Sequence, residues 1–232
     1  MNSEEINYTI FSVKENEIQI SVLENSEKII FNKKIEFKEN YEEFLNDNLN
    51  FFEQSIKELE KKIGYLLKSV NIILPQKNFL EINLSIKENV RDGIVSKKNI
   101  ENVLFNLKNQ ISENNQNYYI NNIRINHFKV ADIIYDNFNS IPECKDYIID
   151  ITFSCLPDKL RNFYKTFFLN FEMTVSKIFS TNNLSVYEDD KSSDHISLAA
   201  KLLYDGHAND VYLVEKDNDK KGFFENLFNL IS

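Results

Sequence analysis

The first forty residues alternate between apolar and polar side chains, a pattern that predicts β-strands. Segments 8–11, 18–23 and 29–37 are rich in β-branched and aromatic residues, a composition typical of strands. Short polar segments separate them, and turns are expected there. The chain should therefore begin with three short strands.

A helical pattern follows, because apolar side chains then recur every three or four residues from about 41 to 67. The apolar run 70–74 ends at Pro75, which predicts a buried strand closed by proline. This order of strands, helix and strand indicates a mixed sheet covered by a helix.

The rest of the chain predicts a second set of elements. Ser96 is placed to cap one helix, and the Pro157-Asp158 pair is typical of the start of another. Residues 181–194 are polar and read as a linker. Strands are expected at 80–86, 120–130, 133–135, 147–155 and 175–179, and helices at 97–111, 159–170 and 196–203, the last ended by Gly206.

The composition narrows the possible classes of protein. The chain has 232 residues, of which 42% are hydrophobic and 27% charged, as in soluble globular proteins. No apolar run approaches the length of about 18 residues expected of a spanning helix, and no signal peptide is visible. Two cysteines, Cys144 and Cys155, suit a reducing cytoplasm. A net charge of −9 disfavours nucleic acid as a partner.

Candidate chemistry is sparse. None of the four glycines opens a phosphate-binding pattern, so no cofactor site is expected. The three histidines lack metal-ligand spacing, and Asp205-Gly206-His207 reads as a helix cap. Cys155 fits the apolar face of a strand better than a nucleophile position, and the acidic run 188–190 fits a solvated linker. We expect no catalytic and no metal-binding residues.

The C-terminal segment has the most distinctive pattern. At 100° per residue, its apolar side chains fill one arc of a helix and its polar side chains fill the other. Such a segment can lie in a bilayer interface, or it can dock onto the chain's own body or a partner's groove. The residues expected to contact a membrane are Lys220, Lys221, Phe223, Phe224, Leu227, Phe228, Leu230 and Ile231.

The order of elements resembles that of the bacterial actin-like cell-division protein FtsA, which tethers the division ring to the inner membrane. Similar segments are 96–104 (SKKNIENVL), 148–153 (IIDITF), 156–160 (LPDKL), 171–175 (FEMTV), 195–203 (HISLAAKLL) and 222–232 (GFFENLFNLIS). The resemblance implies an α/β (α+β) fold, a single actin-like (ribonuclease H-like) lobe with an inserted small α+β subdomain. It places the lobe at 1–79 plus 192–214, the SHS2-like insert at 80–180, a linker at 181–191, and a tether with an amphipathic helix at 215–232.

The chain also departs from that family in two places. Where the family has D-x-G-[ST] between its first strands, this sequence has FSVKEN at 11–16. Only about fifteen polar residues stand where the family carries its second, nucleotide-binding lobe. We therefore expect ATP binding and nucleotide-driven polymerisation to be lost.

The resemblance implies a non-enzymatic adaptor at the cytoplasmic face of the inner membrane, at the division site or septum. Its partners would be the tubulin-like ring protein or other division proteins, reached through the insert, and the membrane surface; a homo-oligomer stays open. One alternative is an actin-like platform protein of a pilus or secretion assembly. Another is an ATP-binding actin-like protein whose loops have drifted.

Overall fold

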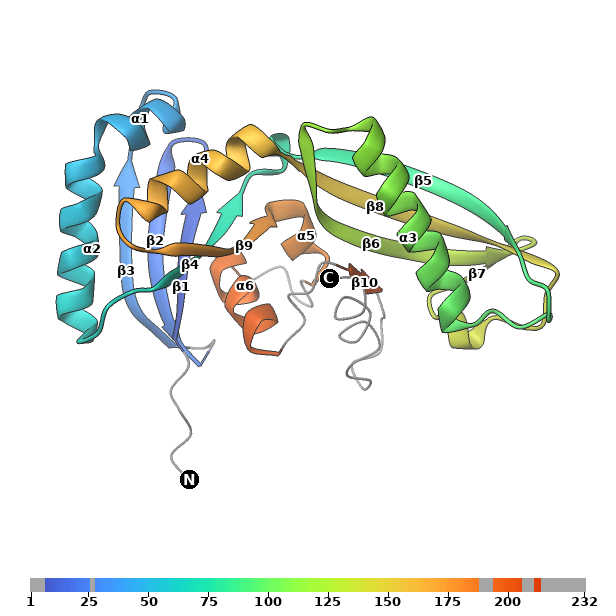
Figure 1. The fold of residues 1–232 in the computed structure, drawn as a ribbon. Coiled ribbons are helices and arrows are strands. Elements are labelled where there is room, and N and C mark those ends of the chain that lie inside the picture. Colours follow the sequence, from blue (N-terminus) through green and yellow to red (C-terminus); the bar gives the residue numbers. More distant parts are fainter. Residues whose placement is uncertain (1–6, 26–27, 188–193, 206–210, 214–232) are drawn as a thin grey trace. The chain divides into compact units, whose positions relative to one another are not determined.

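The computed structural model describes residues 7–25, 28–187, 194–205 and 211–213. The chain divides into two compact units, Met1–Asn78 with Lys159–Ala208 and Phe79–Asp158 with Asn209–Ser232. Within the described ranges, no helix combines the length and the apolar character that crossing a membrane requires. The main elements are β1 (Asn7–Val13), β2 (Glu17–Glu24), β3 (Lys28–Glu36), α1 (Tyr41–Asp47), α2 (Leu49–Ile63), β4 (Ser69–Leu74), β5 (Leu80–Asn89), α3 (Lys97–Asn114), β6 (Tyr118–Val130), β7 (Ile133–Tyr135), β8 (Asp146–Pro157), α4 (Asp158–Leu169), β9 (Thr174–Ser180), α5 (Thr181–Ser185), α6 (His195–Tyr204) and β10 (Val211–Leu213) (Figure 1).

The sheet of the first unit has the strand order β3-β2-β1-β4-β9. β1, β2 and β3 pair antiparallel, as the expected meander requires, whereas β4 is parallel to both β1 and β9. This order, with β2 alone reversed, is that of a ribonuclease H-like lobe. The predicted α/β fold class with an actin-like lobe is confirmed.

Helices cover both faces of this sheet, because β1 carries apolar side chains on both. Ile10 and Phe11 are adjacent in the strand, so they point to opposite faces. Phe11 packs against Phe52 of α2 and Phe168 of α4, with ring centroids 6.3 and 5.1 Å apart. Ile10 lies in a core cluster with Leu184 of α5 and several residues of α6. The sheet is thus the middle layer of this unit.

The helix predicted over 41–67 is two helices in the structure. Asn48 separates α1 from α2, with φ −114° and ψ 26°, and its side-chain amide donates to the Phe44 carbonyl at 2.9 Å. α2 ends at Gly64, whose φ of 85° is the left-handed conformation that favours glycine. The apolar periodicity runs across the break, so it conceals the interruption.

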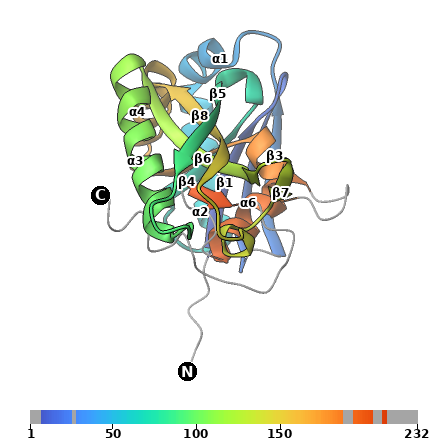
Figure 2. The ribbon, with the colours of Figure 1, turned by 90° about the vertical axis from the view of Figure 1, so that its right-hand side faces the viewer.

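The sheet of the second unit has the order β10-β6-β8-β5, and β7 pairs with β6. α3 lies along one face of this sheet (Figure 1 and Figure 2), and its apolar residues form one core with the inward side chains of β6 and β8. As predicted, Ser96 caps this helix. Its Oγ accepts from the Asn99 amide at 3.3 Å, while Asn99 Oδ1 accepts from the Ser96 amide at 2.9 Å.

The inserted unit ends earlier along the chain than predicted, but it also includes Asn209–Ser232. The predicted lobe segment 192–214 is therefore wrong at its end, where β10 pairs with β6 of the second unit. The expected insert of 80–180 included the helix now called α4 and the strand now called β9, but both belong to the first unit. β9 pairs with β4 from Ser69↔Thr174 to Leu74↔Ser180, so it closes the first sheet. The predicted linker at 181–191 is also wrong at its start, where Thr181–Ser185 form α5 and Leu184 is fully buried.

The position of Phe11 in the middle layer leads to a stability prediction. We expect Phe11→Ala to lower the free energy of unfolding by about 3–5 kcal/mol, because it removes a buried ring and leaves a cavity. Urea denaturation followed by circular dichroism measures the change. Leu169→Ala, which truncates a side chain 68% exposed in the same unit, is the control and should cost less than about 1 kcal/mol. Equal losses in the two variants would contradict this packing.

Candidate functional site

The turn between β1 and β2 stands where the family resemblance implies a phosphate-binding loop. The Lys14 amide donates to the Glu17 carbonyl at 2.8 Å, which closes the turn. The Asn16 carbonyl accepts from the Phe37 amide at 3.1 Å, which fixes the turn to the end of β3. Neither Lys14, Glu15 nor Asn16 has positive φ, the conformation on which loops that bring backbone amides around a phosphate rely.

Carboxylates and ammonium groups pair around this turn. Lys14 Nζ lies 3.1 Å from Glu17 Oε1, Lys34 Nζ lies 3.5 Å from Glu17 Oε2, and Lys77 Nζ lies 3.8 Å from Glu15 Oε1. Burial raises the pKa of Glu17, but the hydrogen bond and charge of Lys14 and the charge of Lys34 outweigh it and hold that pKa below its ordinary value. The three lysines share two carboxylates, so each ammonium group that could attract a phosphate already has a glutamate beside it.

Within the described ranges, the two cysteines, His127 and His195 are not brought together into a reactive group. Cys155 is fully buried in the second unit's core, as predicted, and burial raises its pKa to about 11, far from the thiolate form that a nucleophile needs. His195 Nε2 lies 3.2 Å from Ser185 Oγ. In the described part of the chain, no three or more His, Cys, Asp or Glu side chains are placed to hold a metal ion.

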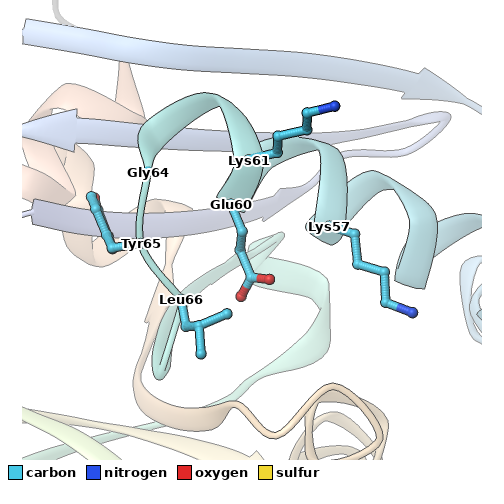
Figure 3. A pocket seen from close by; sticks show the side chains of 6 residues that line it. All are labelled: Lys57, Glu60, Lys61, Gly64, Tyr65 and Leu66. Carbon is cyan, nitrogen blue, oxygen red and sulfur yellow. The ribbon is translucent and has the colours of Figure 1, made fainter.

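A hollow of about 420 Å³ lies at the C-terminal end of α2. Figure 3 shows its lining residues, Lys57, Glu60, Lys61, Gly64, Tyr65 and Leu66. The Glu60 carboxylate already accepts the Leu67 amide at 2.8 Å, and the two lysine side chains extend away from it (Figure 3). These charged groups do not converge on one point, so the hollow does not bring together side chains that could act on a common substrate.

A polar network crosses three strands of the second unit on the face opposite α3. Arg124 Nε donates to Asn126 Oδ1 at 2.9 Å, Asn126 Nδ2 donates to Thr152 Oγ1 at 3.0 Å, and Thr152 Oγ1 donates to Asn83 Oδ1 at 2.7 Å. One step along the sheet, His127 Nε2 lies 2.6 Å from Asp150 Oδ2. Thr152 is only 3% exposed, so the middle of the network is closed to solvent.

This network was not predicted from the sequence, although its signal is present in β6. The apolar residues facing α3 in this strand are Ile120, Ile123, Ile125 and Phe128, with spacings of three, two and three. Side chains on one face of a regular strand recur every two residues, so a spacing of three means that one extra residue is inserted. The β6–β8 pairing shifts register at both places, between Ile120 and Asn122 and between Ile125 and His127. Two β-bulges of this kind re-aim the polar side chains.

Several predicted residues lie outside the described ranges. These are the membrane-contacting residues of 220–231, the acidic run 188–190, and Gly206 and His207 of the expected helix cap. The cap residue itself is Asp205, whose amide donates to the Lys201 carbonyl at 2.8 Å. The membrane assignment therefore stays a prediction.

The ion pairs at the first turn predict a pH dependence. A lowered pKa in the folded state stabilises the fold above the ordinary value of 4.5, and this contribution is lost as the pH falls through the folded-state pKa. We expect Glu17→Gln to lower the free energy of unfolding at pH 7 by less than about 1 kcal/mol, and the deficit to vanish in acid. Urea denaturation across the pH range tests this. Asp47→Asn, which removes an exposed carboxylate of the same unit, is the control. A stability deficit in Glu17→Gln that does not change with pH would contradict the role of these ion pairs.

Two solved structures are similar to this chain. A structure described as "PilM-PilN type IV pilus biogenesis complex" has a TM-score of 0.48 and 7% identity over 79% of this chain and 50% of its own. A Bacteroides thetaiotaomicron protein described as having an actin-like ATPase fold and unknown function has a TM-score of 0.31 and 13% identity over 78% of this chain and 54% of its own. The chain thus spans about half the length of each. Its sequence matches no model of a known protein family and no curated protein sequence, so the resemblance to FtsA gains no support from sequence comparison.

Proposed function

We propose that this protein is a non-enzymatic actin-like adaptor, a platform for protein components of a pilus or secretion assembly. The observation that carries the proposal is the turn between β1 and β2, in a lobe whose fold otherwise suits a nucleotide. A backbone hydrogen bond closes this turn, and each lysine around it is paired with a glutamate. A lobe of this kind that lacks a phosphate loop retains its shape and its surfaces, and those are what an adaptor uses.

The turn disfavours ATP for two physical reasons. A phosphate group needs free backbone amides pointing at it, but the Lys14 amide is bonded to the Glu17 carbonyl. It also needs uncompensated positive charge, but Lys14 and Lys77 each lie beside a glutamate. Without a phosphate site at this turn, the described part of the chain offers no group to which we would assign hydrolysis.

The inserted subdomain supports a role in assembly. In the FtsA family, which this chain resembles, the insert is associated with protein partners and subunit contacts. An actin-like platform protein of a pilus or secretion machine likewise has a lobe with an inserted subdomain. One of the two similar structures is itself described as a type IV pilus biogenesis complex. Pilus or secretion genes beside the gene for this chain would favour the platform.

A second candidate is a cell-division adaptor, favoured by the separated apolar and polar arcs of 223–232. That segment resembles the membrane-targeting helix of the FtsA family, and the partners would then be division-ring proteins. Both candidates place the protein at the cytoplasmic face of the inner membrane. Division and cell-wall genes beside the gene for this chain would favour this candidate.

The lack of a phosphate loop at the β1–β2 turn predicts that ATP leaves the protein unchanged. Titration of magnesium and ATP into the full chain should give no saturable heat, and millimolar ATP should leave the melting temperature unchanged. A ligand present at 100 times its Kd would stabilise the fold by about 2.7 kcal/mol, a shift of several degrees. A clear rise in melting temperature or a saturable heat would overturn the non-enzymatic assignment.

Membrane attachment predicts flotation with liposomes. The full chain should float with vesicles of mixed zwitterionic and anionic lipid, and a chain ending at Asp219 should not. Phe224→Asp with Phe228→Asp should reduce partitioning more than about tenfold, because two buried aromatic side chains are lost. Asn226→Asp with Asn229→Asp adds the same charge to the polar arc and is the matched control. Equal flotation of the full and shortened chains would refute the attachment.

A further inference from the structure

β7 has a free outer edge within the described part of the chain. It pairs with β6 through Phe128↔Tyr135, Lys129↔Ile134 and Val130↔Ile133, and no described strand lies on its other side. Two consecutive isoleucines, Ile133 and Ile134, are 60% and 59% exposed. Successive side chains of a strand point to opposite faces, so neither face of this strand buries its isoleucine.

The backbone of this edge is set up for another strand. A two-residue turn, Ala131-Asp132, joins β6 to β7, so Val130 and Ile133 are the hydrogen-bonded pair that closes the hairpin. Bonded and non-bonded pairs alternate in an antiparallel ladder, so Lys129 and Ile134 are a non-bonded pair. The N–H and C=O of Ile134 therefore point away from β6, toward the open edge.

Apart from its short length of three residues, β7 lacks the features that usually block an exposed edge. Natural edges are commonly protected by proline, by lysine or by a bulge. β7 reads Ile-Ile-Tyr, and its register with β6 is regular. Asp132 and Asp136, two residues to either side of Ile134, are both exposed. The edge is thus a short apolar strand between two acidic positions.

Asp132 and Asp136 determine which kind of strand can pair with the β7 edge. In an antiparallel pair of two β7 strands centred on Ile134, Asp132 of each copy would lie opposite Asp136 of the other, and like charges directly opposite are destabilising. A strand carrying a basic residue opposite each aspartate gains two favourable cross-strand pairs instead. Lys129 lies 3.9 Å from Asp132, but Asp132 is fully exposed and can contact a second cation.

We propose that the β7 edge binds an extended segment of a partner protein by strand addition. The segment has an apolar residue opposite Ile134 and basic residues two positions to either side, facing Asp132 and Asp136. β6 already accepts a strand from a distant part of the chain on the same side, where β10 pairs in parallel with Ile123, Arg124 and Ile125. The inference goes beyond the proposed function, because it holds whether or not the chain attaches to a membrane or lacks ATPase activity.

A synthetic peptide tests this surface with the full chain. The probe is Thr-Lys-Thr-Ile-Thr-Lys-Thr, and its counterpart replaces both lysines by glutamate. The basic peptide should bind at least about tenfold more tightly than the acidic one, and less tightly as salt rises. The double variant Asp132→Lys with Asp136→Lys should reverse the preference. Equal affinity for the two peptides, or binding of neither, would overturn the proposal.

A second variant separates the edge from general surface stickiness. Ile134→Pro removes the outward N–H but no β6–β7 hydrogen bond, so the hairpin should remain folded and binding should fall at least about tenfold. Phe105→Asn, which removes an exposed side chain of α3, should leave binding unchanged. Unchanged binding in Ile134→Pro would refute strand addition. Self-association of the full chain that Ile134→Pro abolishes would overturn the choice of occupant, since a second copy would then fill the edge.

Discussion

The parallel pairing of β4 with both β1 and β9 is the constraint on which the rest of the fold depends. A parallel neighbour cannot be reached by a tight turn, so the chain must cross over between such strands. The first crossover contains β2, β3, α1 and α2, and the second contains β5 to β8 and α4. The inserted unit thus occupies a connection that has to be long in any case. Thr181 accepts the Gln76 amide at 3.2 Å, which ties the departure from β4 to the chain just beyond β9.

Most local elements could be predicted from the sequence, except α5, β10 and the break at Asn48, but the assignment of strands to sheets could not. The spacing of apolar residues located these helices and strands, because positions that face the core carry apolar side chains and positions that face solvent carry polar ones. β9 has no local feature that distinguishes pairing with β4 from pairing with the insert's strands, and its placement in the insert was wrong for that reason. The break at Asn48 was missed because Phe44 and Phe52 continue one apolar stripe across it, with ring centroids 5.9 Å apart.

The candidate site was predictable where it depends on residue type and unpredictable where it depends on distant partners. The sequence FSVKEN lacks the glycine of a phosphate loop, so the loss of that loop could be anticipated. Lys34 and Lys77, which pair with Glu17 and Glu15, come from other segments, and only the fold brings them there. The network around Thr152 depends likewise on the register of β5, β6 and β8, which two bulges in β6 shift.

Several polar and reactive groups in the described part of the chain already have partners within the fold or are buried, which agrees with the proposed role as an adaptor. The Thr152 hydroxyl accepts from Asn126 and donates to Asn83, so its bonding capacity is used within the sheet, where it fixes strand register. The Glu17 carboxylate is bonded to Lys14, and the Cys155 thiol is buried and protonated. The backbone groups at the outer edge of β7 differ from these, because no described strand pairs with them and a partner strand would have to displace only water there. A partner protein of the proposed kind therefore gains more hydrogen bonds at the β7 edge than at Thr152, Glu17 or Cys155, whose groups are already bonded or buried.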